Sequence, residues 1–167
     1  MKLFHLSENP AIAHFAPRPS DYTAKPVVWA IDAAKRPNYL LPRDCPRVCF
    51  RAGSTSSADH RAQFLGTDRA VIAVEAAWWA RIRTTTLFDY AMPPASFRLQ
   101  DESAGYWVAE APVTPLGMEE IPDLPTAIAM EDATLRVLPS LWALHDAVAA
   151  SSLVFSMIRM RNAGPRG

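Results

Sequence analysis

The stretch AVIAVE, residues 70–75, is a run of alanine, valine and isoleucine that ends on a glutamate. An apolar run of this length, rich in β-branched residues, is typical of a buried strand. The residues that follow it, AAWWARIR at 76–83, favour a helix, and a short helix before it is expected to end at Gly66. A strand between two short helices is the starting point for the fold class.

Further strands and helices follow outward from this run in irregular order. Strands are predicted at 2–6 (KLFHL), 27–31 (VVWAI), 47–51 (RVCFR), 84–92 (TTTLFDYAM), 105–116 (GYWVAEAPVTPL), 134–138 (TLRVL) and 152–160 (SLVFSMIRM). Short helices are predicted at 33–41, 60–66, 123–132 and 140–151, with one helical turn at 9–15 and a proline-containing connection at 92–104. The sequence thus predicts a single α+β domain over residues 1–163, with a bent, mainly antiparallel sheet, short helices and a flexible tail at 164–167.

The charge balance permits an anionic ligand and argues against a duplex-DNA binder. The 167 residues contain 17 basic and 17 acidic side chains, with 12 basic and 8 acidic in residues 1–90. This excess permits an anionic ligand near the first half, but the neutral total disfavours a duplex-DNA binder.

The N-terminal apolar stretch is too short for a signal peptide, and no window is long enough to span a membrane, so we expect a cytoplasmic protein.

The two cysteines, Cys45 and Cys49, lie four residues apart in RDCPRVCFR. There is no second cysteine pair and no histidine nearby, which makes a zinc site a poor match. A proline between them and a strand start at residue 47 also leave the side chains badly aimed for a disulfide. We therefore expect two free thiols and no metal.

The first candidate site lies on the first predicted strand, which carries His5 and Ser7. Residues i and i+2 of a strand point to the same face, so the imidazole and the hydroxyl lie side by side. That pair suits a flat polar ligand laid across the strand. The alternative is structural: the histidine bonds to the backbone, and the serine caps the turn that follows it.

The segments LFHLS and VVWAID, with a later helix that carries Tyr39, resemble the N-terminal half of the ADP-ribosyltransferase-like fold. In that family a strand with His-x-Ser or His-x-Thr holds the ribose and nicotinamide of NAD. A later strand ends in an aromatic residue, and a tyrosine or phenylalanine stacks on the nicotinamide. The resemblance covers about residues 3–50 and implies that His5, Ser7, Trp29 and Tyr39 bind NAD as cofactor.

Such transferases also need a late glutamate or glutamine that stabilises the developing oxocarbenium ion. The candidates for this catalytic residue are Glu110, in GYWVAE, and Glu75, which closes AVIAVE; neither lies in a matching motif. A pyrophosphate needs cations, and Arg43 and Arg47 in PRDCPRV are expected to clamp one. The alternative for these arginines is an ion pair with Asp44 that fixes the loop.

The whole chain also resembles a family of small bacterial proteins of unknown function, through VWAID, PRDCPRV, GYWV and IRMRNA. Two functions remain open: an NAD-dependent ADP-ribosyltransferase-like enzyme, and a non-catalytic module that binds a nucleotide, another anionic small molecule or a protein. On either hypothesis we expect His5, Ser7 and Tyr39 to line one concave pocket, with an arginine at its rim.

Whether the protein forms oligomers is left open. A catalytic dyad of His145 and Asp146 is not expected, because adjacent helical residues do not face each other.

Overall fold

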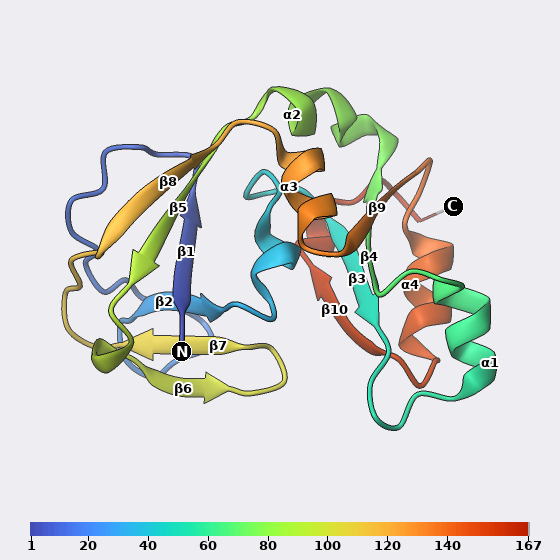
Figure 1. Cartoon of the computed structure of the whole chain (residues 1–167), viewed down its shortest axis with the longest axis horizontal. Coiled ribbons are helices and arrows are strands. Elements are labelled where there is room, and N and C mark those ends of the chain that lie inside the picture. The colour runs from blue at the N-terminus through green and yellow to red at the C-terminus, as the bar shows by residue number, and fades with distance from the viewer. Residues whose placement is uncertain (167) are drawn as a thin grey trace. The chain divides into compact units, whose positions relative to one another are not determined.

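The computed structural model describes residues 1–166 and has an α+β fold, as predicted. The chain divides into two compact units, each built from two separate segments. Unit 1 contains residues 1–40 and 86–122, and unit 2 contains residues 41–85 and 123–166 (Figure 1). Each unit has its own sheet, so the prediction of one bent sheet is wrong. That these units form a single domain stays a prediction.

Unit 1 holds a six-stranded sheet in which every neighbouring pair is antiparallel. The strand order is β6-β7-β2-β1-β5-β8. The strands are β1 (Leu3–Ser7), β2 (Val28–Asp32), β5 (Leu87–Met92), β6 (Arg98–Asp101), β7 (Tyr106–Ala109) and β8 (Gly117–Ile121). The first strand therefore lies inside the sheet, which confirms the prediction made for KLFHL.

One face of this sheet carries the core of unit 1. Leu3 lies opposite Met92, and His5 lies opposite Tyr90, so these residues share a face. The cluster on this face comprises Leu3, Phe15, Val28, Ala30, Tyr90, Met92, Phe97, Ala109 and Val113. The Tyr90 hydroxyl donates to the carbonyl of Asn9, which fastens the loop after β1 over the core.

Unit 2 holds a four-stranded sheet in the order β10-β3-β4-β9. The strands are β3 (Arg47–Arg51), β4 (Ala70–Glu75), β9 (Ala133–Leu138) and β10 (Val154–Ile158). The pair β4–β9 is parallel and the other two pairs are antiparallel. The run AVIAVE is a central strand, buried from its second residue to its last, as its composition predicts.

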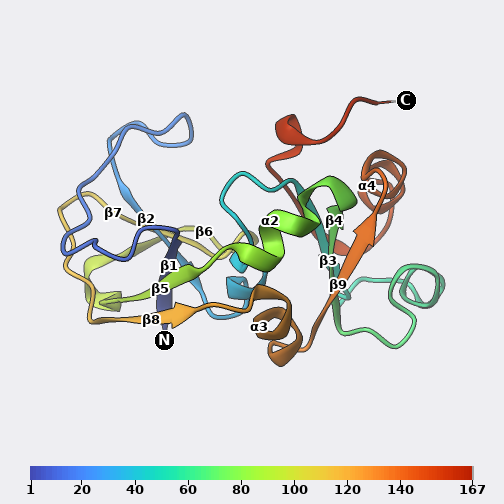
Figure 2. The same ribbon diagram turned by 90° about the horizontal axis from the view of Figure 1, so that it is seen from above.

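Helices cover both faces of the unit 2 sheet. They are α1 (Ala58–His60), continued by a π-helical turn (Arg61–Leu65), α2 (Trp79–Thr84), α3 (Leu124–Met130) and α4 (Trp142–Ala149). Figure 2 shows α1 and α4 on one side of this sheet and α2 and α3 on the other. On the first side, Phe64 and Leu141 pack with Val48 and Val71 of the strands. Gly66 ends the π-helical turn at φ +58°, a conformation suited to glycine.

Several segments differ from the predictions. Strand β6 and strand β8 were not expected, because nearly all of their residues are exposed. Residues 9–15 form no helical turn: Asn9 accepts a hydrogen bond from the amide of Ala11, and Phe15 forms an isolated bridge with Val113. In the segment predicted as a flexible tail, the amide of Gly164 donates to Glu75, and the flexibility of residues 164–167 stays a prediction. Gly167 lies outside the described residues.

None of the helices within residues 1–166 combines the length and the hydropathy needed to cross a bilayer.

Candidate functional site

The His5 imidazole makes a structural contact in unit 1. Its Nδ1 lies 2.8 Å from the carbonyl oxygen of Trp29. A carbonyl only accepts, so Nδ1 carries the proton and donates it to the backbone. The ring also packs on Phe15, with the two ring centroids 4.6 Å apart. The backbone contact is the one that the structural alternative predicts for this histidine.

Ser7 lies on the same face of β1 as His5, as the strand period predicts. Its hydroxyl oxygen accepts a hydrogen bond from the amide of Asn9 at 3.1 Å. The serine thus caps the turn that follows the strand, again as in the structural alternative.

Tyr39 does not join His5. Its hydroxyl is hydrogen-bonded to the hydroxyl of Tyr106, and the two rings meet edge to face. Tyr106 lies opposite Ile31 on β2, and Ile31 lies opposite Phe4 on β1. Because opposite residues share a face and neighbours alternate, Tyr106 and Phe4 lie on the face opposite to His5. The expectation that His5 and Tyr39 line one pocket is therefore wrong.

Trp29 is the other aromatic residue of the predicted NAD site, besides Tyr39. Its ring packs edge to face against the ring of Tyr106, on the Tyr39 side of the sheet, while its carbonyl holds His5. Trp29, Tyr39 and Tyr106 thus form an aromatic group on one face, separate from the His5 imidazole.

Arg43 and Arg47 belong to unit 2. Arg47 is only 2% exposed, and its Nη2 donates to the carbonyl of Arg43 at 3.4 Å. A guanidinium this deeply buried is poorly placed to meet a ligand from solvent. The neighbouring turn is fixed by Asn162, whose amide donates to the carbonyl of Asp44.

Glu75 also belongs to unit 2, where it closes β4 and is 4% exposed. Its carboxylate accepts hydrogen bonds from the amides of Leu141 (3.4 Å) and Gly164 (2.9 Å). It thus joins the start of α4 and the C-terminal segment to the sheet. These contacts describe an anchor for the backbone.

Glu110, unlike the buried Glu75, lines a cavity of about 220 Å³ in unit 1. The cavity is formed by the loop before β2, by β6 and by the residue that follows β7. It is lined by Tyr22, Thr23, Ala24, Lys25, Val27, Arg98, Gln100 and Glu110. Of the eight site residues predicted from the sequence, Glu110 alone lines it.

Two cations share the Glu110 carboxylate. Lys25 Nζ lies 2.9 Å from its Oε2, and Arg98 Nη2 lies 3.4 Å from its Oε1. The hydrogen bond and charge of Lys25, followed by those of Arg98, hold the pKa of Glu110 below its usual value. Arg98 also donates to the Gln100 side chain at 2.9 Å. The three charged groups sum to one positive charge beside the 82%-exposed Tyr22.

Sequence reasoning missed Lys25, Arg98 and Tyr22. Two lie in a loop without periodicity, and Arg98 lies in a segment predicted as a connection. Glu110 and Lys25 are 85 residues apart in the chain, so no local spacing signals their pairing.

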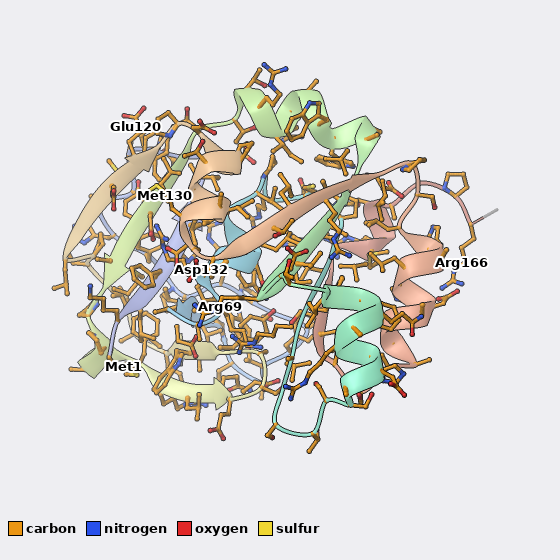
Figure 3. The ribbon with its side chains drawn as sticks, turned by 45° about the vertical axis from the view of Figure 1, so that its right-hand side comes forward. Met1, Arg69, Glu120, Met130, Asp132 and Arg166 are labelled. Atoms are coloured by element: carbon orange, nitrogen blue, oxygen red, sulfur yellow. The ribbon has the colours of Figure 1, made fainter. Side chains whose placement is uncertain are left out.

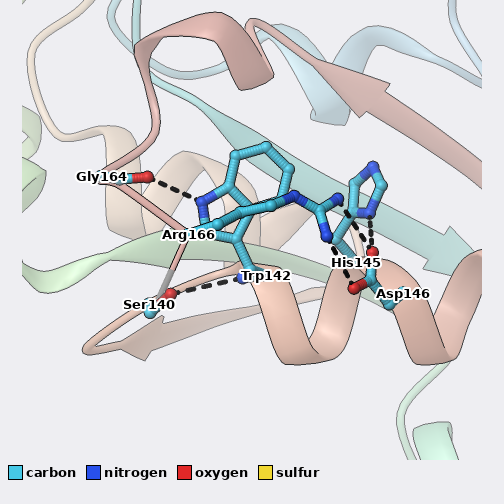
Figure 4. A network of polar contacts seen from close by, with 6 residues as sticks. All are labelled: Ser140, Trp142, His145, Asp146, Gly164 and Arg166. Atoms are coloured by element: carbon cyan, nitrogen blue, oxygen red, sulfur yellow. Dashed lines mark hydrogen bonds and ion pairs between the residues drawn. The ribbon is translucent and has the colours of Figure 1, made fainter.

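A second polar network lies in unit 2, around α4 (Figure 4). Arg166 pairs with both oxygens of Asp146, at 2.9 and 3.1 Å, and lies over the ring of Trp142. His145 Nδ1 also lies 2.8 Å from Asp146, so the expectation that these neighbours do not meet is wrong. Trp142 donates to the carbonyl of Gly164 at 2.7 Å. This network fastens the C-terminal segment to the helix.

The chain was compared with protein families, curated proteins and solved structures. The model of a family described as "Family of unknown function (DUF6886)" matches residues 4–163. No curated protein and no solved structure matches the chain. None of these comparisons supports the resemblance to ADP-ribosyltransferases. Because the family match spans nearly the whole chain and segments of both units, the chain belongs to this family of unknown function.

Proposed function

We propose that the protein binds an anionic small molecule of the nucleotide class in the cavity around Lys25, Arg98 and Glu110. The observation that carries the proposal is the arrangement of two cations around one carboxylate in a concave site. Arginine and lysine are the side chains that proteins use most to hold phosphate. The internal carboxylate occupies the position of the anion until a ligand replaces it.

The remaining lining residues suit the other parts of a nucleotide. Tyr22 offers an exposed ring on which a base stacks, and Gln100 and Thr23 offer groups that hydrogen-bond to a sugar or base edge. The volume limits the ligand: small-molecule pockets commonly measure roughly 300–1,000 Å³. A cavity of about 220 Å³ encloses a phosphate and a ribose, and leaves most of a dinucleotide such as NAD outside.

Binding without transfer is the function that this geometry supports best. An ADP-ribosyltransferase site needs the histidine, the stacking tyrosine and the acid around one ligand, and His5 and Tyr39 lie on opposite faces of the sheet. Transfer from NAD stays a prediction for Glu110, which is held ionised and so suits a carboxylate that stabilises a cation. Ligand titration and the variant E110Q separate nucleotide binding from transfer.

The test is calorimetric titration of the purified protein with ADP, ADP-ribose, NAD and inorganic phosphate. Wild type is expected to bind ADP and ADP-ribose, and the variants R98Q and K25Q are expected to bind them more weakly. R69Q is the matched control, because Arg69 forms a comparable exposed ion pair, with Asp132 at 2.9 Å in unit 2 (Figure 3). No heat with any of the four ligands, or equal losses in R98Q and R69Q, would overturn the proposal.

The variant E110Q distinguishes a competing anion from a catalytic acid. If Glu110 only occupies the anion position, its neutralisation frees both cations, and ADP binds a few fold more tightly. If Glu110 is catalytic, the wild type releases nicotinamide from NAD, and E110Q stops that release. Weaker ADP binding in E110Q would contradict the role of Glu110 as the internal anion.

A further inference from the structure

The edges of the two sheets carry an inference that is independent of the proposed ligand. Among residues 1–166 the sheets end on four edge strands: β6 and β8 in unit 1, and β9 and β10 in unit 2. An edge strand presents unpaired backbone N–H and C=O groups to a further strand. Proteins block this pairing with charged side chains, prolines or bulges.

Three of the four edge strands carry such a block. Strand β6 has Arg98 and Asp101 and a register irregularity between Leu99 and Asp101. Strand β8 has two adjacent glutamates, Glu119 and Glu120, one on each face. Strand β9 has Arg136, which is paired with Asp68 at 2.8 Å.

Strand β10 has no block. Its sequence VFSMI contains no charge, proline or glycine. It pairs with β3 on one side and forms the edge of the sheet on the other. Val154 is 37% exposed and Phe155 is 41% exposed, although they point to opposite faces. Large apolar side chains are thus exposed on both faces at the start of this strand.

We propose that β10 pairs with β10 of a second copy of this chain, in antiparallel orientation about a two-fold axis at Ser156. In that register Val154 lies opposite the partner's Ile158, and Phe155 lies opposite the partner's Met157. The two Ser156 hydroxyls meet at the axis. Each cross-strand pair is apolar or joins two hydroxyls, so no like charges oppose each other.

A second copy fits this edge better than an open chain of copies does. An antiparallel strand pair is self-complementary, which is what a two-fold dimer requires. Once the two β10 strands pair, the joined sheet ends on β9 at both sides, and Arg136 blocks further addition there. The association therefore closes at two copies. An interface built around five residues per chain is small, so the dimer is expected to dissociate on dilution.

The test is sedimentation equilibrium over a range of protein concentrations. Wild type is expected to shift from monomer to dimer as concentration rises, and F155K is expected to stay monomeric. V137K is the matched control, because Val137 is 41% exposed on the other edge strand of the same sheet. A wild type that is monomeric at every concentration, or that associates beyond the dimer, would overturn the proposal. Equal dimerisation of wild type and F155K would do the same.

Hydrogen exchange of the wild type keeps the proposal testable if F155K does not fold. Amides of residues 154–158 are expected to exchange more slowly at high protein concentration than at low concentration. A dimer whose concentration-dependent protection lies elsewhere in the chain would show that β10 is not its interface.

Discussion

The substitution His5→Ala separates a structural histidine from a ligand-binding one. In the structure the imidazole donates to the Trp29 carbonyl at 2.8 Å and packs on Phe15. Alanine removes both contacts and leaves that carbonyl without this donor. The structural role predicts a loss of stability, whereas a cleft residue would contribute little packing.

The size of the loss follows from the two contacts. A buried hydrogen bond contributes about 0.5–1.5 kcal/mol. A tilted ring pair at 4.6 Å contributes about 0.5–1.5 kcal/mol beyond its buried area. The free energy of unfolding is thus expected to fall by about 2 kcal/mol, since both contacts are partly buried. For a chain of this length each 1 kcal/mol lowers Tm by roughly 2–4 °C, so Tm is expected to fall by about 4–8 °C.

The measurement is urea unfolding followed by circular dichroism, with ADP titration of the same samples. His14→Ala is the matched control, because His14 is exposed and its Nδ1 contacts the hydroxyl of Thr114, itself exposed, at 2.9 Å. We expect a small change in that control and unchanged ADP affinity in both variants. An unchanged Tm in His5→Ala, together with lost ADP binding, would refute the structural interpretation and restore His5 to the ligand site.

Three further predictions concern unit 2. Burial, opposed by Arg47, raises the pKa of the Cys45 thiol to about 11 from 9.0. The unfolded thiol therefore loses its proton first as pH rises. The free energy of unfolding should fall by on the order of 2–3 kcal/mol between about pH 9 and 11, and the fall should be smaller in Cys45→Ala. Thiol titration under denaturing, non-reducing conditions should count two free groups, since both cysteines are free and buried; a count of zero would contradict the structure. Glu75→Ala should speed hydrogen exchange at the Gly164 amide, while Glu75→Gln keeps an acceptor and should slow it again; equal rates in both variants would argue against the anchor.

Composition predicts the strands that are stabilised by burial. AVIAVE and RVCFR lie in the middle of the unit 2 sheet, and their apolar residues are buried almost completely. Strands β6 and β8 are different, because they are polar and stabilised by hydrogen bonds to β7 and β5. Their sequences therefore lack the alternation that local pattern analysis needs. The number of sheets is equally invisible locally, since each unit joins two segments from distant parts of the chain.

The sequence predicts which site residues share a face within one strand, but not which residues of other elements lie on that face. The period of two places His5 and Ser7 on one face, and the structure agrees. The side reached by Tyr39 depends on the register of β1 with β2, and on a 3₁₀ turn at Arg36–Tyr39 instead of a longer helix. Register is a long-range property, and a shift of one residue would move every side chain to the other face.

The net charge around the cavity also depends on which segments of the chain fold together. The sequence places a positive excess in residues 1–90, but each unit takes segments from both halves of the chain. Unit 1, which contains the cavity, has six basic and nine acidic residues, so its overall field repels an anion. Attraction must therefore come from Lys25 and Arg98 at short range. Contacts at that range are screened by salt less than the long-range repulsion is. Moderate salt should therefore weaken ADP binding less than it weakens binding to a surface that attracts nucleotides by its net charge.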